Sequence, residues 1–264
     1  MILKNDILIS VIMNCYNSSE FLREAIESVL AQTYQNWEII FWDNVSTDNT
    51  QDVLRKVRKD FPTLRVAFEG KKGFGNALLK GFSVARGDVL GYIHGDNQME
   101  TIAVFKMYQR IVDNNLALCK ATRLNRNDGI YRWIISKSYN LLFGVIFSIK
   151  MKDINGSPKL FTKDFFEEAR LKSQDWFIDP EIVLRAHELG VKMSEYEIQT
   201  RPRKYGNSEV RVMTVFEFLK NMYHYYRKQL NCHLDSYATF CFLEHLRKLF
   251  KLKKFQTTII LPFI

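Results

Sequence analysis

The sequence predicts an α/β fold with a mostly parallel central sheet flanked by helices. Short apolar runs rich in β-branched residues alternate along the chain with longer stretches in which apolar residues recur every three or four positions. Strand and helix units of this length form parallel sheets, because each helix returns the chain to the start of the next strand. The chain has 264 residues, 47% of them apolar and 25% charged, which is enough to bury a large core.

The first two strands are the clearest elements. Residues 7–13 (ILISVIM) form the continuous apolar run of a strand that is covered on both faces. Asn17 is placed to cap the next helix, with Glu20 three residues further on as in a capping box, and residues 21–30 carry the apolar face of that helix. The second strand, 38–43 (EIIFWD), ends in the polar turn DNVSTDNT.

The alternation continues beyond these two strands, without an internal repeat, a low-complexity segment or an obvious linker. The further predicted elements are a helix over 51–60, a strand over 65–69, a helix over 76–85, a strand over 88–96, a helix from about Thr101 and a strand over 116–122.

Charge and cysteine usage limit the classes of function. Lys and Arg number 38 and Asp and Glu 29, so the net charge is +9, which suits nucleic acid, an anionic membrane face or phosphorylated substrates. No zinc finger, RNP-type aromatic pattern or arginine-rich arm is present, which disfavours nucleic acid. Cys15, Cys119, Cys232 and Cys241 form no CxxC pair, which argues against a zinc site or a disulfide framework and favours a reducing compartment.

Two features bear on membranes. The N-terminus reaches a charged, strand-like segment within a few residues, so we expect no secretory signal. The longest charge-free apolar stretch, 138–149, is well short of the roughly 20 residues that span a bilayer. We therefore expect a protein that is not integral to a membrane.

Polar clusters follow three of the predicted strands: NCYNSSE (14–20), DNVSTDNT (43–50) and HGDNQ (94–98). One such cluster is typical of a turn, but ligands of open α/β sheets bind beyond the carboxyl ends of the strands, so three clusters would converge on one cleft. Neither GxGxxG nor GxxxxGK[ST] follows the first strand. A dinucleotide-binding Rossmann domain and a P-loop NTPase are therefore disfavoured.

These blocks carry a resemblance. Residues 9–50 resemble the opening of family 2 glycosyltransferases, whose pattern is a strand, PxYN, a helix with S(V/I)xxQT and a strand ending in DDGSxDxT. Residues 75–98 resemble their next block, which ends in the DXD metal motif. DINGSPKLF (153–161) and RPRKYGNSEVR (201–211) are similar to the polyprenyl-phosphate hexosyltransferase branch, of which dolichol-phosphate mannose synthase is the familiar member. The resemblance covers about residues 7–211 and implies the GT-A nucleotide-sugar-binding fold.

The resemblance implies a GT-A domain over residues 1–211, followed by a helical, basic amphipathic extension over 212–264. The extension mixes aromatic residues with cations at near-helical spacing, most densely in residues 236–255. A helix of this kind can lie in an anionic membrane surface, or it can pack its apolar face on the domain while its lysines face water. The sequence leaves both possibilities open, and the resemblance to transferases with a lipid acceptor favours the membrane surface.

The resemblance also implies a site for the donor. Tyr16 would stack on the donor base and Asp43 would accept its ring N–H, since a flat base needs an aromatic face and a carboxylate. Alone, each residue is more often core packing or a turn cap. Asn44 stands where relatives often have a second Asp. The implied donor-binding residues are Asn14, Tyr16, Asn17, Asp43, Asn44, Ser46, Asn76, Lys80, Gly95, Asp96, Arg203 and Ser208.

The predicted metal ligands are Asp96, Gln98 and His94. In the branch this motif reads D-x-D-x-Q, so Asp96 and Gln98 match the second acid and the amide, and His94 replaces the first acid. Mn²⁺ or Mg²⁺ held there would neutralise the diphosphate leaving group. Imidazole suits Mn²⁺ better than Mg²⁺. In the alternative interpretation Asp96 is a loop cap and His94 marks a non-catalytic copy.

Three residues are candidates for catalysis. Arg203 begins the RxxGxS element, and its guanidinium can pair with phosphate oxygens. Asp179 is the candidate general base if the acceptor is a sugar hydroxyl, and Asp153 is the second candidate. A lipid phosphate is already anionic and needs no base.

The resemblance implies inverting transfer of a hexose from a UDP- or GDP-linked sugar to a polyprenyl phosphate, by a cytoplasmic enzyme peripheral to the inner membrane face. One alternative is a saccharide-elongating transferase of surface polysaccharide synthesis, which would depend on Asp179. Another is a non-catalytic nucleotide-sugar-binding homologue, suggested by His94 and Asn44. The expected partners are a nucleotide diphosphate sugar, a polyprenyl phosphate or glycan acceptor and an anionic membrane surface, but no nucleic acid.

Overall fold

The computed structural model describes residues 7–20, 22–30, 34–43, 45–61, 64–68, 73–94, 102–124, 130–200 and 212–229. The chain divides into two compact units, one of residues 1–133 with 151–209 and one of residues 134–150 with 210–264. These units differ from the predicted boundary at residue 211 mainly in the assignment of residues 134–150, and the predicted domains stay a prediction.

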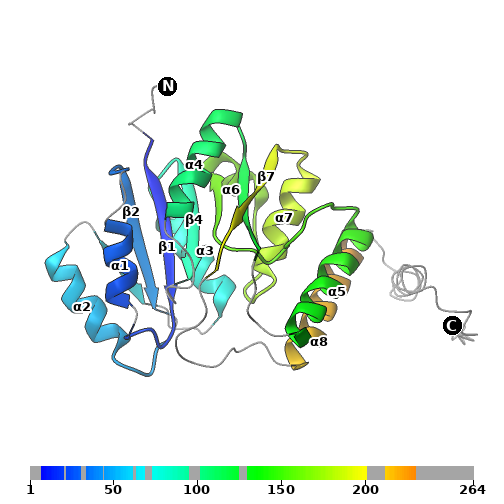
Figure 1. Cartoon of the computed structure of the whole chain (residues 1–264). Coiled ribbons are helices and arrows are strands. Elements are labelled where there is room, and N and C mark those ends of the chain that lie inside the picture. The colour runs from blue at the N-terminus through cyan, green and yellow to red at the C-terminus, as the bar shows by residue number, and fades with distance from the viewer. Residues whose placement is uncertain are drawn as a thin grey trace, which may run out of the picture. The chain divides into compact units, whose positions relative to one another are not determined.

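A seven-stranded sheet forms the centre of the first unit in the described part of the chain (Figure 1). Its order is β3-β2-β1-β4-β6-β5-β7. The strands are β1 (Ile9–Cys15), β2 (Trp37–Asp43), β3 (Arg65–Phe68), β4 (Val89–His94), β5 (Leu118–Arg123), β6 (Lys159–Thr162) and β7 (Met193–Ile198). Only β6 runs antiparallel to its neighbours, β4 and β5. The predicted, mostly parallel sheet is confirmed.

Helices cover both faces of this sheet (Figure 1). One face carries α1 (Leu22–Leu30), α2 (Thr50–Asp60) and α4 (Ile102–Asn114), and the other carries α3 (Phe74–Val84), α6 (Lys163–Ala169) and α7 (Ile178–Glu188). Strand β1 contributes side chains to the apolar cores on both faces of the sheet. Val11 and Met13 belong to the core beneath α1, α2 and α4, and Ile12 belongs to the core beneath α3, α6 and α7. This is why its sequence is apolar without alternation.

Two predicted helix starts differ from the structure. Helix α1 begins at Leu22, and Asn17 does not cap it. Asn17 instead has a φ of 48°, and its side-chain oxygen accepts a hydrogen bond of 2.9 Å from the backbone N–H of Thr47. The prediction of an Asn17 cap is wrong because a tertiary contact takes up the side chain that a cap would use. Helix α3 begins at Phe74, two residues earlier than predicted.

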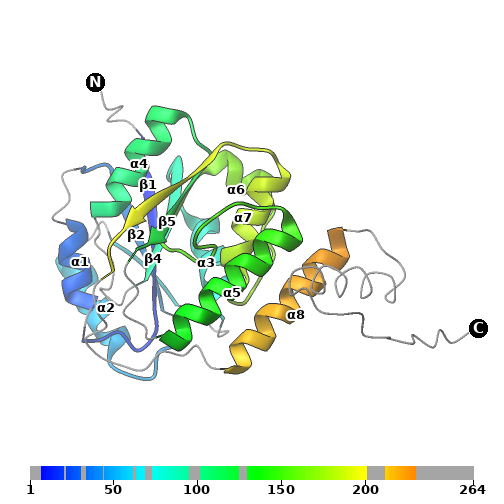
Figure 2. The same ribbon diagram turned by 45° about the vertical axis from the view of Figure 1, so that its right-hand side comes forward.

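The second unit pairs α5 (Ile130–Phe147), from residue 134 onwards, with α8 (Val212–Gln229). Figure 2 shows the two helices side by side. The rings of Tyr139 and Phe218 lie 5.3 Å apart, and those of Phe147 and Tyr225 lie 6.0 Å apart. Residues 212–229 are thus helical, and residues 236–255 lie outside the described residues. None of the described helices is both long and apolar enough to cross a membrane.

A buried ion pair joins β5 to the edge strand β7. The Lys120 side chain is fully buried, and its Nζ lies 2.8 Å from Oε1 of Glu195, which also accepts a hydrogen bond from the Thr122 hydroxyl. Burial lowers the pKa of Lys120, and Glu195 opposes that shift. Burial also acts to raise the pKa of Glu195, but Lys120 and the hydrogen bonds outweigh it, so the pKa is lowered. The charge on Lys120 therefore depends on Glu195.

Glu195→Gln should lower the free energy of unfolding by roughly 3 kcal/mol at pH 7, because it leaves a buried ammonium without a counter-charge. The pKa of Glu195 is lowered on folding, so its contribution is fully present above the unfolded pKa of about 4.3. It is lost as the pH falls through the lower folded value. Urea unfolding of the wild type and of Glu195→Gln should therefore show a difference in the free energy of unfolding that narrows from pH 7 to pH 3.

The matched control is Glu197→Gln on the same strand. Glu197 pairs with Lys152 at 2.8 Å, but both side chains are at least half exposed, so the free energy of unfolding should hardly change. Equal effects of the two substitutions would contradict the assignment of a buried, Glu195-dependent charge.

Candidate functional site

The carboxyl ends of the parallel strands lie along one edge of the sheet. There β1, β2 and β4 end at Cys15, Asp43 and His94. Strand β6 runs the other way and begins at the same edge with Lys159, which pairs with Tyr92. The edge thus brings together the ends of all the strands that precede the predicted polar clusters.

The first two polar clusters form one hydrogen-bonded rim. The backbone N–H of Asn17 donates to the hydroxyl of Ser46 at 3.0 Å, and the hydroxyl of Ser19 donates to Asp48 at 2.8 Å. Burial acts to raise the pKa of Asp48, but hydrogen bonds from Thr50 and Ser19 outweigh it, so the pKa is lowered. The predicted convergence holds for these clusters, whereas His94 alone represents the third cluster among the described residues.

Asp43 and Tyr16, predicted to hold the donor base, lie at this rim. Asp43 is 1% exposed, and its carboxylate accepts hydrogen bonds from the side chain of Gln51 at 2.8 Å and from the backbone of Ser46 at 3.3 Å. Tyr16 is half-buried. Asp43 therefore shapes the loop after β2, and its contact with a base stays a prediction.

The start of α3 and the segment before α7 form a neighbouring wall. The backbone N–H of Asn76 donates to the carbonyl of Gln174 at 3.1 Å. A Cβ on Gly75 would lie 2.3 Å from the carbonyl oxygen of Ser173, so only glycine allows this approach of the two backbones. Asn76 is half-buried, and Lys80, one turn further along α3, is exposed.

An aromatic stack connects this wall to the end of β4. The ring of Phe74 stacks on the imidazole of His94, with centroids 5.4 Å apart and planes at 25°. It also stacks on the indole of Trp176, at 4.4 Å and 17°. Trp176 is 40% exposed. The stack orients His94, and sequence reasoning missed both Phe74 and Trp176, although an aromatic residue between two glycines and a Trp beside Asp175 were visible signals.

The two candidate bases are buried partners of cations. Asp179 is 5% exposed, its Oδ1 lies 2.5 Å from Nζ of Lys159, and the hydroxyl of Tyr92 donates to the same oxygen. Burial raises the pKa of Asp179 and lowers that of Lys159. Asp153 forms a bidentate pair with Arg123, at 2.8 and 3.0 Å. Both carboxyl groups therefore have structural partners beneath the edge.

His94 is the predicted metal ligand that the structure describes. Outside the described residues lie Asn44, Gly95, Asp96, Gln98, Arg203 and Ser208. Within the described ranges no group of three or more His, Cys, Asp and Glu could hold a metal ion. However, Asn14 is the register partner of His94, and its Oδ1 is buried without a hydrogen-bond partner among the described residues. An amide oxygen beside an imidazole fits Mn²⁺.

Known proteins resemble this chain in sequence. Residues 10–172 match the model of glycosyl transferase family 2. An uncharacterized glycosyltransferase of Nostoc sp. is 39% identical over 90 residues, which cover 34% of this chain and 28% of that protein. The dolichol-phosphate mannosyltransferase of Pyrococcus furiosus is 26% identical over 224 residues, covering 81% of this chain and 62% of that protein. The matched regions thus span less than two thirds of both relatives.

Solved structures resemble the fold. Glucosyl-3-phosphoglycerate synthase from Mycobacterium tuberculosis in complex with UDP superposes with a TM-score of 0.65 at 13% identity, over 88% of this chain and 83% of that one. The same synthase with Mn²⁺, UDP and glucosyl-3-phosphoglycerate gives 0.61 at 14% identity, over 95% and 82%. This likeness confirms the predicted GT-A fold. Since the family model matches more than half of its residues, the chain belongs to glycosyl transferase family 2.

Proposed function

We propose that this family 2 glycosyltransferase transfers a hexose from a UDP- or GDP-linked sugar to a polyprenyl phosphate, with inversion at the anomeric carbon and with Mn²⁺ or Mg²⁺ bound. The use of a nucleotide sugar follows from the family. The proposal for the acceptor rests on one observation: the candidate bases at the carboxyl edge are buried and already paired with cations.

A sugar hydroxyl must lose a proton as it attacks, so its enzyme needs a carboxylate that is open to the acceptor. Asp153 and Asp179 are buried against Arg123 and Lys159. Two other carboxylates near α7 also accept hydrogen bonds from the backbone, Asp175 from Phe177 at 2.8 Å and Glu181 from Ser173 at 2.7 Å. A phosphate acceptor is ionised near neutral pH, so it needs no general base. It therefore fits an edge at which these carboxylates take part in structural ion pairs and hydrogen bonds.

Sequence similarity supports the same acceptor. The Pyrococcus furiosus relative aligned over 81% of this chain is named for dolichol phosphate. The block 153–161, which resembles the polyprenyl-phosphate branch, begins with Asp153 and contains Lys159. Both residues belong to the buried ion pairs beneath the edge. The motif thus has a physical role in this chain, because it supplies one candidate base, Asp153, and the cation Lys159 that pairs with the other.

A lipid acceptor also requires contact with a membrane, and the second unit supports a peripheral location at the cytoplasmic face. Helix α5 exposes Ile134, Leu141 and Val145, which share one face at helical spacing. Lys137 and Lys150 are exposed in the same unit. Apolar side chains flanked by cations are typical of helices that lie in an anionic surface.

The chemical nature of the product distinguishes a polyprenyl phosphate acceptor from a saccharide acceptor. Incubation with labelled UDP- and GDP-hexoses, Mn²⁺ and polyprenyl phosphate should give a labelled glycosyl phosphate that extracts into organic solvent and is released by mild acid. Omission of the lipid is the control. Label that appears only in water-soluble saccharide when glycan acceptors are supplied would refute the proposal and favour the elongating transferase.

Asp179→Asn should lower the free energy of unfolding by about 3–5 kcal/mol, because it leaves the buried Lys159 without a counter-charge. Turnover per folded molecule should fall far less than the roughly 10²–10⁴-fold typical of a missing base. Denaturant unfolding and turnover in the same buffer measure both effects.

The double variant Lys159→Met with Asp179→Leu controls for loss of folding, since apolar groups of similar volume can replace a buried pair with little loss of stability. A stable double variant with almost no turnover would show that Asp179 acts in the chemistry and would contradict an acceptor that needs no base.

Asp96→Asn should abolish metal-dependent turnover and leave the melting temperature unchanged, since it removes the carboxylate that we assign to the cation. His94→Asp is the matched variant in the same motif. It should keep activity and move the preference from Mn²⁺ towards Mg²⁺. Near-normal turnover of Asp96→Asn in the presence of EDTA would overturn the assignment.

A further inference from the structure

Two neighbouring polar atoms at the carboxyl edge are buried and unpaired within the part of the chain that the structure describes. They are Oδ1 of Asn14 in β1 and Nε1 of Trp42 in β2, and the two residues are register partners. Trp42 is 6% exposed. Buried polar groups without partners are rare and destabilising, so two of them side by side at an edge where α/β proteins bind ligands point to a bound group that supplies the missing hydrogen bond and ligand.

The two residues share a face of the sheet with His94. Asn14 is paired with Trp42 on one side and with His94 on the other. Side chains two residues apart in a strand lie on the same face, and the face that holds Ile12 and Tyr92 is the one covered by α3. Trp42, Asn14 and His94 therefore form a row, called here the edge row, that offers an N–H donor, an amide oxygen and an imidazole.

The edge row departs from the family pattern at two adjacent places. PxYN has a proline where this chain has Asn14, and D-x-D-x-Q has an acid where it has His94. Proline carries no polar side-chain atom. The chain therefore lacks a carboxylate at residue 94 but has an additional amide oxygen at the paired residue in β1.

We infer that the edge row binds the diphosphate of the donor together with its cation, with Asn14 Oδ1 facing the cation beside His94 and Trp42 Nε1–H donating to a phosphate oxygen. The inference rests on the proposed nucleotide-sugar function. When bound, the cation neutralises the charge that develops on the leaving diphosphate.

The chemistry of the unpaired atoms selects this ligand. An amide oxygen is a good ligand for a hard cation, whereas an indole N–H can only donate and needs an electron-rich partner. A diphosphate with its divalent cation offers a cation for the amide oxygen and, next to it, a phosphate oxygen for the indole N–H. Phe74, stacked on His94, orients the imidazole that completes the row.

The experiment measures Mn²⁺ and nucleotide binding rather than turnover. Full-length protein is titrated with Mn²⁺ in the presence of UDP or of GDP, with free Mn²⁺ followed by electron paramagnetic resonance. Asn14→Leu keeps the size of the side chain and removes the oxygen, so it should weaken Mn²⁺ binding roughly tenfold. Asn14→Asp supplies a carboxylate oxygen and should bind Mn²⁺ at least as tightly as the wild type.

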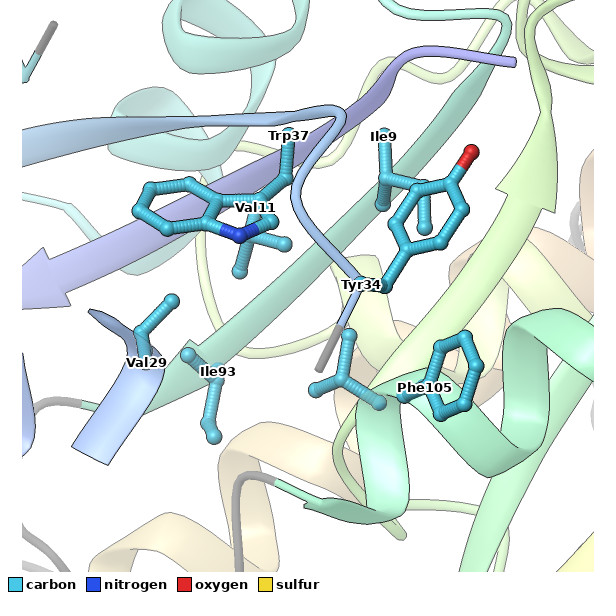
Figure 3. A pocket seen from close by; sticks show the side chains of 8 residues that line it. Ile9, Val11, Val29, Tyr34, Trp37, Ile93 and Phe105 are labelled. Atoms are coloured by element: carbon cyan, nitrogen blue, oxygen red, sulfur yellow. The ribbon is translucent and has the colours of Figure 1, made fainter. Parts of the chain in front are cut away.

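Two tryptophans of β2 provide a matched pair. Trp42→Phe removes only the pyrrole N–H side of the ring and should weaken Mn²⁺-dependent nucleotide binding roughly tenfold. Trp37 also has a buried Nε1 without a described partner. It lines a separate apolar cavity of about 30 Å³ with Val29, Val11 and Ile93, shown in Figure 3. Trp37→Phe should therefore leave nucleotide binding unchanged.

The outcomes separate the inference from the proposed function. If the wild type shows no Mn²⁺-dependent binding of UDP or GDP, both are overturned. A second outcome is that the wild type binds the nucleotide with Mn²⁺, and that Asn14→Leu and Trp42→Phe bind it equally well and melt near the wild-type temperature. In that case the unpaired atoms hold a buried water, and only the inference fails. If Trp37→Phe weakens binding as much as Trp42→Phe, the effect is one of packing, and the inference fails as well.

Discussion

The contact between Lys159 and Asp179 joins three elements that the rest of the site depends on. Lys159 opens β6, Asp179 lies in the first turn of α7, and Tyr92 of β4 donates to the same carboxylate. Strand β6 is the antiparallel strand of the described sheet, so its first residue enters where the parallel strands end. Burial of both charged groups is tolerable only because each satisfies the other.

Through this contact the position of α7 determines the wall of the site. The segment just before α7 packs on the start of α3 through Gly75 and the carbonyl of Ser173, and it places Trp176 on Phe74. Phe74 in turn holds the imidazole of His94 at the end of β4. The chain of contacts therefore runs from a buried ion pair to the strand end that precedes the predicted metal-binding loop.

The parts of the fold that follow from local pattern could be predicted. Apolar runs predicted β1 and β2, because strands covered on both faces need apolar residues throughout. Strands β6 and β7 were not predicted from the sequence. Strand β6 has four residues and starts with a buried Lys, and β7 alternates in polarity with Glu195 and Glu197. Their charges find partners far along the chain, which no local pattern shows.

The same distinction between local pattern and distant contacts applies to the residues of the site. The positions of Asp43 and His94 at strand ends could be read from motifs, because strand ends follow from the apolar runs. The interaction partner of a buried side chain could not be predicted from the sequence. Asn17 was expected to cap a helix and instead bonds to Thr47, and the contact of Asp179, the candidate base for a hydroxyl acceptor, with Lys159 was not foreseen. In each case a contact between distant segments decided what the side chain does.

The stack of Trp176, Phe74 and His94 also gives the molecule an optical property. Trp176 is 40% exposed, and its ring plane lies within 17° of the Phe74 ring that stacks on the imidazole. A change of charge or position at His94 alters the environment of an indole only one ring away. In a variant that keeps Trp176 and replaces the other three tryptophans, indole emission would therefore report events at the end of β4 without an added dye.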